Sequence, residues 1–197
     1  MNAIVQQSYN RYTVADYLGW NDDERWELID GVAYNMSPAP VIKHQNIAGR
    51  LYSRLEQALR GKSCQPFIAP VDVILSERDV VQPDVIVVCD PARITEKNIQ
   101  GAPDLVVEVL SPSTAVKDLR EKKALYQRAG VREYLVIDPS ANYVQAWRQD
   151  GQQHFREAEV YAADDMLPLL ALDGLEIALS ELFGLPEAAP VKGPPLV

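Results

Sequence analysis

Two acidic residues stand in segments of the chain that are otherwise apolar. Asp84 precedes an apolar run at 85–89, and Glu108 interrupts another at 105–110. In these runs the residues at odd and at even positions are both apolar, which is typical of central strands covered on both faces. A buried carboxylate without a partner is costly, so each acid needs a cation nearby, which can be Arg, Lys or a divalent metal. The alternative is that both acids lie at strand ends, where they face solvent or accept hydrogen bonds from backbone N–H groups.

Lys122 is the candidate for such a cation. At about 100° of rotation per residue, it falls in the middle of the apolar face of a helix predicted at 116–129. A lysine on a core-facing position either extends its ammonium group to the surface or meets a buried carboxylate, such as Glu108. An ion pair with Asp118, one turn earlier on the same helix, is the local alternative.

Two carboxylates and a lysine suit metal-assisted hydrolysis of a phosphodiester. The carboxylates would hold Mg²⁺ or Mn²⁺, the metal would activate a water molecule, and the lysine would stabilise the charge that develops on the phosphate. Acyl-transfer chemistry has little support, because the chain has only His44 and His154 and no G-x-S-x-G motif. No G-x-G-x-x-G or Walker loop is present, so a nucleotide cofactor is not expected.

Length and composition are typical of one folded soluble domain. The chain has 197 residues, 47% hydrophobic and 24% charged, which is enough to form a core without disulfides or metals. We expect one domain at 1–185 and a mobile, Pro-rich tail at 186–197. No apolar run approaches the ~20 residues of a membrane span, and the N-terminus lacks a signal-peptide pattern. We therefore expect a cytoplasmic protein, away from membranes, in which Cys64 and Cys89 are reduced.

Charge is unevenly distributed along the chain. The formal net charge is −9, which argues against a general nucleic-acid coat protein. Residues 41–62 nevertheless carry +4 (five basic, one acidic), and residues 117–134 carry +3 (six basic, three acidic). These two segments are the candidate DNA-facing elements, although solvated helix faces would show the same pattern.

The elements that must position these residues alternate between strands and helices. Thr13 to Asp16 forms a capping box that opens a short helix, and Asp30-Gly31 is a hairpin turn between strands at 26–29 and 32–36. Apolar residues at helical spacing predict an amphipathic helix at 43–60 whose basic residues point outward. Further strands are predicted at 67–69, 71–75, 85–89, 105–110, 134–137 and 143–147, followed by a weaker pair and a turn at 180–183. This order predicts an α/β (α+β) fold, with one mixed central β-sheet flanked by helices and an N-terminal β-hairpin.

Several strings of the sequence together resemble the Uma family of bacterial endonucleases. They are Pro83-Asp84, the stretch GAPDLVVEVLSPST at 101–114, and the pattern D-x3-K-x3-Y-x3-G-V at 118–131. The strings ELIDG at 27–31 and MSP at 36–38, together with His44, also match that family. The resemblance spans residues 13–183, which is nearly the whole chain, and the combined motifs are specific.

The resemblance implies a restriction-endonuclease-like fold with a site of the PD-(D/E)xK type. By that resemblance Asp84 and Glu108 are the two acids of the motif, and the backbone carbonyl of Val109 is a further metal ligand. The position two residues after Glu108 is Leu110 rather than the usual lysine. The family is thought to have moved this lysine to the following helix, where Lys122 stands.

Four further residues match family positions or neighbour the candidate site, and we treat them as accessory. Glu27 is either an extra acid of the metal site or, as we favour, part of a polar pair in the core or hairpin. His44 is interpreted as a helix cap or a surface residue rather than a base. Tyr126 is expected to belong to the core, and Asp118 is the alternative local partner of Lys122.

The leading hypothesis is a Mg²⁺- or Mn²⁺-dependent endonuclease that acts on DNA. A homodimer would suit it, because two symmetric sites match the two strands of a duplex. A catalytically silent module of the same fold that binds nucleic acid or protein is the main alternative, favoured by the acidic net charge and by Leu110. A hydrolase of small phosphodiesters is a third hypothesis.

Overall fold

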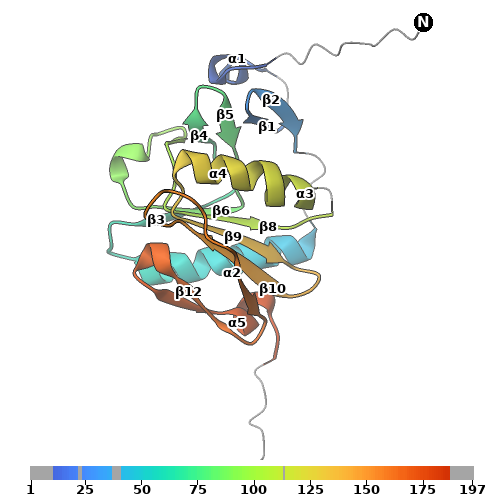
Figure 1. Cartoon of the computed structure of the whole chain (residues 1–197), viewed down its shortest axis with the longest axis vertical. Coiled ribbons are helices and arrows are strands. Elements are labelled where there is room, and N and C mark those ends of the chain that lie inside the picture. Colours follow the sequence, from blue (N-terminus) through green and yellow to red (C-terminus); the bar gives the residue numbers. More distant parts are fainter. Residues whose placement is uncertain (1–10, 22–23, 37–40, 113, 187–197) are drawn as a thin grey trace, which may run out of the picture.

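The computed structural model describes residues 11–21, 24–36, 41–112 and 114–186. It has three layers, with a six-stranded sheet in the middle (Figure 1). Helix α2 (Ile42–Leu59) covers one face of this sheet, while helix α4 (Lys123–Ala129) and a five-stranded sheet cover the other. The predicted tail lies outside the described residues from position 187 onward.

The six-stranded sheet is mixed and has the order β11-β10-β9-β8-β6-β3. Strands β8 and β9 are parallel, and the other neighbours are antiparallel. Every residue of β6 and β8 is buried, which confirms that these two apolar runs are central strands. The bounds of the six strands are β3 (Gln65–Ile68), β6 (Val85–Val88), β8 (Leu105–Val109), β9 (Glu133–Asp138), β10 (Tyr143–Arg148) and β11 (Glu159–Ala162).

The face covered by α2 also carries a small C-terminal unit. It consists of β12 (Met166–Leu169), the 3₁₀ turn η3 (Leu170–Leu172), β13 (Leu175–Ala178) and α5 (Leu179–Phe183). The apolar stripe of α2 is buried against the sheet, and its basic residues point outward, as predicted. Two of those basic residues contact α5, because Arg50 donates to the carbonyl of Leu182 at 3.1 Å and Arg54 forms an ion pair with Glu181.

The helix predicted at 116–129 is present but not uniform. It comprises α3 (Ala115–Lys117), a π-helical turn η2 (Asp118–Lys122) and α4, and it connects the parallel strands β8 and β9. It ends at Gly130, whose φ of +89° is the left-handed conformation that glycine adopts at helix ends. The π-helical turn was not predicted, because the apolar pattern was interpreted with one constant helical period.

The second sheet is built on the predicted hairpin and has the order β2-β1-β5-β4-β7. Asp30 and Gly31 both have positive φ, which suits the two-residue turn between β1 (Trp26–Ile29) and β2 (Val32–Asn35). The capping box from Thr13 to Asp16 opens α1 (Val14–Leu18), as predicted. The other elements here are β4 (Val73–Ser76), β5 (Asp79–Val81), β7 (Ile99–Gln100) and the 3₁₀ turn η1 (Pro91–Arg93), of which β5, β7 and η1 were not predicted.

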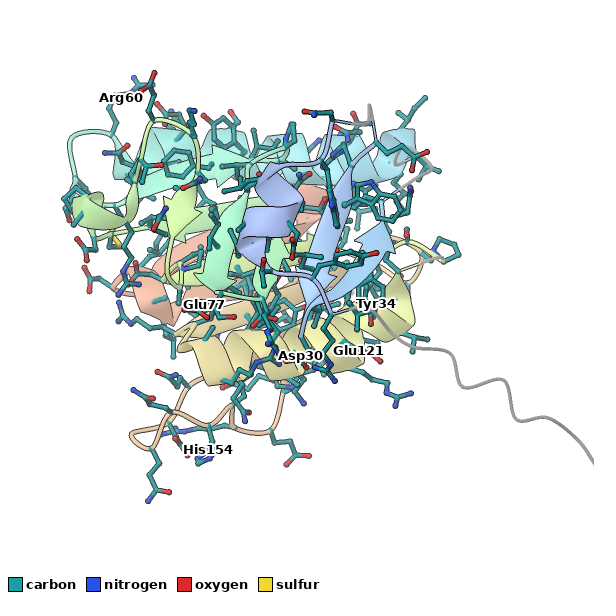
Figure 2. The ribbon with its side chains drawn as sticks, turned by 90° about the horizontal axis from the view of Figure 1, so that it is seen from above. Asp30, Tyr34, Arg60, Glu77, Glu121 and His154 are labelled. Carbon is teal, nitrogen blue, oxygen red and sulfur yellow. A yellow bond between two sulfur atoms is a disulfide. The ribbon has the colours of Figure 1, made fainter. Side chains whose placement is uncertain are left out.

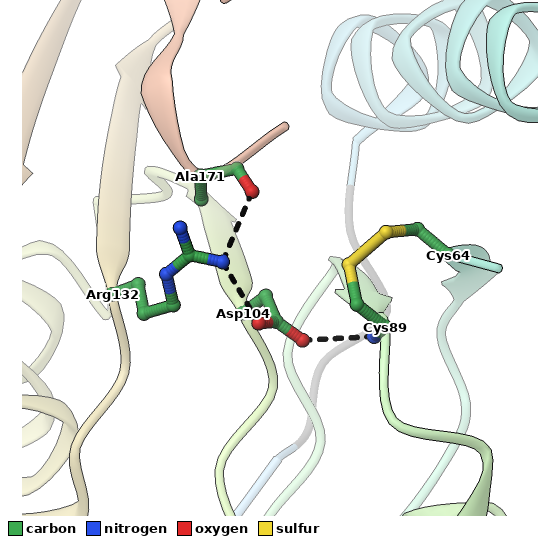
Figure 3. The surroundings of a disulfide bond; sticks show 5 residues. All are labelled: Cys64, Cys89, Asp104, Arg132 and Ala171. Atoms are coloured by element: carbon green, nitrogen blue, oxygen red, sulfur yellow. Dashed lines mark hydrogen bonds and ion pairs between the residues drawn. A yellow bond between two sulfur atoms is a disulfide. The ribbon is translucent and has the colours of Figure 1, made fainter. Parts of the chain in front are cut away.

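The two cysteines form a disulfide (Figure 3), so the expectation that both are reduced thiols is wrong. They flank the antiparallel pair β3–β6, in which Gln65 lies opposite Val88. Cys64 and Cys89 are therefore the next facing pair along the ladder. Their separation of 25 residues follows from the strand register, which a search for C-x-x-C or Cys/His spacing does not detect. The disulfide also removes the argument for a reducing compartment.

None of the helices in the described part of the chain has the length and apolar character of a membrane span.

Candidate active site

Strand register brings the two predicted acids together. Strands β6 and β8 are antiparallel and Val85 lies opposite Val107, so Asp84 and Glu108 face each other one position further along. The backbone N–H of Val109 donates to Oδ2 of Asp84 at 2.8 Å, which ties the two strand ends to each other. Both acids thus lie where two neighbouring central strands of the six-stranded sheet begin or end.

Glu108 is buried, with 4% of its surface exposed. Its Oε1 accepts hydrogen bonds from Nζ of Lys122 at 2.9 Å and from the hydroxyl of Tyr126 at 2.7 Å. Among the described residues, Oε2 has no hydrogen-bond partner. Burial raises the pKa of Glu108 to about 8, although the ammonium group of Lys122 opposes that rise. Tyr126 is a core residue, as expected, and its hydroxyl also reaches the site.

Asp84 is held by a histidine from the opposite layer. Nε2 of His44, in the first turn of α2, lies 3.0 Å from Oδ2 of Asp84. His44 is only 6% exposed, so its interpretation as a helix cap or surface residue is wrong. Oδ1 of Asp84 has no hydrogen-bond partner within the part of the chain that the structure describes.

Lys122 does not extend to the surface. It is 3% exposed, and its Nζ lies 2.7 Å from Oε1 of Glu27, 2.9 Å from Oε1 of Glu108 and 3.7 Å from Oδ1 of Asp118. Burial alone would lower the pKa of Lys122, but Glu108, Glu27 and Asp118 raise it well above its usual value. The lysine is therefore a cation that joins three acids, and the pair with Asp118 is its longest contact.

Glu27 is fully buried and binds two lysines. Its Oε2 lies 2.8 Å from Nζ of Lys117, and its Oε1 accepts from the backbone N–H of Gln82 at 3.0 Å as well as from Lys122. Burial alone would raise the pKa of Glu27, but Lys122 and Lys117 hold it at about 2. The interpretation of Glu27 that we favoured from the sequence, a polar pair in the core or hairpin, fits this geometry. Its two lysine partners, however, come from the helix and not from the hairpin. Lys117 was not predicted as a site residue.

Asp118 and Lys122, which are both buried, are the first and last residues of the π-helical turn. Short π-helical turns inside α-helices are frequent at functional sites. Burial raises the pKa of Asp118. Its Oδ1 has no hydrogen-bond partner among the described residues, whereas its backbone carbonyl accepts from the hydroxyl of Tyr134 at 3.0 Å.

A cavity of about 900 Å³ is lined by His44, Asp84, Glu108, Lys117, Asp118 and Lys122. Tyr34 of β2 and Glu121 of the π-helical turn, both labelled in Figure 2, also line it. The four carboxyl groups of the cluster, from Glu27, Asp84, Glu108 and Asp118, face two ammonium groups. With every group ionised, the cluster therefore carries an excess of two negative charges. In the described ranges, no three His, Cys, Asp or Glu side chains are already arranged to hold a metal ion.

Comparison with known proteins identifies the family. Residues 12–180 match the Uma2 family, described as "Putative restriction endonuclease". An uncharacterized protein of Synechocystis sp. is 28% identical over 172 residues, which cover 85% of this chain and 89% of that protein. A second uncharacterized protein of Synechocystis sp. is 25% identical over 154 residues, covering 75% of this chain and 86% of that protein.

A solved structure confirms the fold. The crystal structure of a protein from Anabaena variabilis, described as a putative nuclease belonging to DUF820, superposes with a TM-score of 0.72 at 21% identity. The superposition covers 87% of this chain and 97% of that chain. The predicted mixed α/β fold is thereby confirmed. Since the family match covers most of the sequence, the chain belongs to the Uma2 family, whose description is "Putative restriction endonuclease".

Proposed function

We propose that this protein is a Mg²⁺- or Mn²⁺-dependent endonuclease that hydrolyses DNA phosphodiester bonds through Asp84, Glu108 and Lys122. One observation carries the proposal. Two acids face each other across adjacent strands at a cavity wall, each with one oxygen that has no partner among the described residues, and a buried lysine binds one of them. The family description and the nuclease-like fold support the same class of reaction.

The residues present fit a divalent cation. Oδ1 of Asp84 and Oε2 of Glu108 are two available carboxylate oxygens, and Val109, whose backbone carbonyl would be the third ligand, lines the same cavity. Mg²⁺ is commonly held by one or two carboxylates and keeps several waters, so no larger set of acidic side chains is required. The cation would supply an activated water and neutralise charge on the phosphate. Its charge would also balance the excess of two negative charges that the cluster carries when every group is ionised.

Lys122 would act as a fixed positive charge rather than as a base. Its raised pKa keeps the ammonium group protonated, and the contact with Glu27 holds it beside Glu108. In this position the ammonium group can donate to the attacking water and stabilise the negative charge that develops on phosphate oxygens. Because it contacts Glu108 from the helix, Lys122 can take the role that Leu110, the residue that follows β8, cannot fill.

A catalytically silent binding module of the same fold is the second candidate. It is favoured because the described residues contain no ready cluster of three metal-binding side chains, and because Lys122 already neutralises part of the charge of Glu108. In such a module the buried ion pairs between Lys122 and the acids would only hold the helix against the sheet. The hypothesis of a hydrolase for small phosphodiesters differs from both in predicting metal-dependent hydrolysis without affinity for DNA.

Plasmid nicking in Mn²⁺ and in Mg²⁺ tests the proposal. Wild type should nick supercoiled plasmid, while Asp84→Asn and Glu108→Gln, purified identically, should be inactive. Glu96→Gln is the matched control, because Glu96 is exposed and its loss changes the net charge equally. Equal nicking by all four preparations would identify a contaminant. Nicking by none would favour the silent module.

The proposal includes DNA as partner and a homodimer as the active form. Two symmetric sites would place one cluster on each strand of a duplex. Light scattering coupled to size-exclusion chromatography should give twice the monomer mass of 22.0 kDa, either alone or with duplex DNA. A monomer in both conditions would contradict the dimer and leave the proposed chemistry unaffected.

A further inference from the structure

Arg25 lines the same cavity as the two acids and is held in a defined orientation. Its Nε and one terminal nitrogen both donate to Oε1 of Gln82, at 2.9 Å and 2.6 Å. Arg25 itself is exposed, whereas Gln82 is buried. Gln82 therefore holds the guanidinium group in place at the cavity, and the remaining N–H groups of Arg25 stay available as donors.

The partner of Arg25 is itself immobilised. Nε2 of Gln82 donates to Oδ1 of Asp72 at 2.8 Å, and the hydroxyl of Tyr17 donates to the same oxygen at 2.8 Å. The backbone N–H of Gln82 donates to Glu27, inside the acidic cluster. This network fixes the rotamer of Gln82, so that little conformational entropy remains to be lost when Arg25 binds a ligand.

Within the described part of the chain, Arg25 differs from the neighbouring bases in having no carboxylate partner for its charge. Lys117 and Lys122, the other strong bases that line the cavity, both contact carboxylates within 3 Å. Arg25 contacts a neutral amide, and among the described residues no carboxylate lies within ion-pair distance of it. An oriented guanidinium that no described carboxylate neutralises is suited to a phosphate group, which it can contact through two parallel hydrogen bonds.

We propose that Arg25 binds a second phosphate of the substrate, next to the phosphodiester that is cleaved, and so selects a nucleic-acid strand over a molecule with one phosphodiester. The inference rests on the proposed function. Gln82, which anchors Arg25, is only two residues before Asp84, and both line the cavity. A substrate with several phosphates in a row can reach both positions, whereas a single phosphodiester can reach only one.

Binding of a fluorescein-labelled DNA oligonucleotide tests the inference without requiring activity. Fluorescence anisotropy in Ca²⁺ should show that Arg25→Gln weakens affinity by about 10-fold and reduces the slope of log affinity against log salt by ~0.7 to 0.9. Arg156→Gln removes the same charge from an exposed position that does not line the cavity and lies outside both basic segments, and it should change affinity by less than 2-fold. Arg25→Lys, which keeps the charge but not the fork, should give an intermediate affinity. Equal affinities of Arg25→Gln and Arg156→Gln, or no binding by wild type, would overturn the inference.

Hydrolysis of two substrates separates this inference from the proposed function. Arg25→Gln should raise KM for the oligonucleotide while leaving hydrolysis of bis(4-nitrophenyl) phosphate, which has one phosphodiester, within 2-fold of wild type. Equal losses on both substrates would overturn the role in a second phosphate site. If wild type hydrolyses neither substrate, the proposed function fails, and the anisotropy contrast still decides whether Arg25 binds phosphate.

Discussion

Replacing Glu108 by Gln should stabilise the metal-free protein at alkaline pH. The carboxyl group of Glu108 is buried, and its pKa lies at about 8 instead of the ordinary 4.5. The folded state therefore favours the protonated form, which a glutamine resembles in shape and charge. Glu108 thus lowers the stability of the metal-free protein when it ionises. A metal-binding role would explain an acid at this position, because a bound cation would favour the ionised form.

The magnitude and sign follow from the difference in proton binding between the folded and unfolded states. Below pH 4.5 both states are protonated at Glu108, so this residue contributes no pH dependence. Between pH 4.5 and about 8 the unfolded chain loses the proton first, so stability falls as pH rises. Each pH unit in this interval costs ~1.36 kcal/mol, and the full penalty above it is therefore at most about 5 kcal/mol. The Glu108→Gln variant lacks this penalty.

Urea unfolding in EDTA at pH 5 and at pH 9 measures the effect. We expect similar free energies of unfolding for wild type and Glu108→Gln at pH 5, and a variant that is more stable by several kcal/mol at pH 9. Glu96→Gln, at an exposed site, should behave as wild type at both pH values. Added Mg²⁺ should stabilise wild type but not Glu108→Gln at pH 9. If Glu108→Gln were less stable than wild type at pH 9 in EDTA, Glu108 would be an ionised structural partner of Lys122 and the reasoning would be refuted.

Three further predictions concern the surroundings of the site and the disulfide. Lys122→Met should destabilise the protein by about 3–5 kcal/mol, measured by urea unfolding, because it leaves buried acids without their shared cation. His44→Phe removes the ring nitrogen that holds Asp84 and should weaken Mn²⁺ binding, measured by calorimetry, by about 10- to 100-fold. Replacing both Cys64 and Cys89 by Ser opens a loop of 25 residues and should lower the free energy of unfolding by about 3.5 kcal/mol.

Matched variants control for changes that do not involve these contacts. Lys97→Met and His154→Phe alter exposed residues of the same types and should leave stability and Mn²⁺ affinity close to wild type. Equal effects of Lys122→Met and Lys97→Met would mean that the buried network does not stabilise the fold. Wild-type Mn²⁺ affinity in His44→Phe would remove His44 from the site, and an unchanged urea midpoint in the double serine variant would contradict a stabilising disulfide.

The central part of the site could be predicted from local patterns. Runs that are apolar on both parities identified β6 and β8 as buried strands, so Asp84 and Glu108 stood out as polar interruptions. Helical periodicity placed Lys122 on the inward face of its helix. In each case the signal is a polar residue inside a pattern that demands an apolar one, and that conflict is visible in a single short window.

The surroundings of the site depend on contacts that no short window contains. Glu27, Lys117 and His44 come from a hairpin, a helix end and the opposite layer, and only the packed fold brings them to the acids. Arg25 acquires its orientation from Gln82, which is distant in sequence and has no polar pattern of its own. The π-helical turn changes the helical period locally, so a constant angle per residue cannot detect it.

Strand register limits the prediction of the remaining fold in the same way. The disulfide depends on which residues of β3 and β6 face each other, and register is set by tertiary packing and turn geometry rather than by cysteine spacing. Strands β5 and β7 have three and two residues, too few for an alternating pattern to be recognised. The larger elements, by contrast, carried enough periodicity to predict the mixed fold correctly.

The most direct test of the central claim is the position of Mn²⁺ in crystals of the protein soaked in that ion. Data collected at a wavelength where manganese scatters anomalously should show a peak between Asp84 and Glu108, within coordination distance of the Val109 carbonyl. The same soak of Asp84→Asn crystals should show no such peak. A wild-type map with no peak there, or with peaks only at other positions, would contradict the assignment of these acids to a metal-dependent nuclease site.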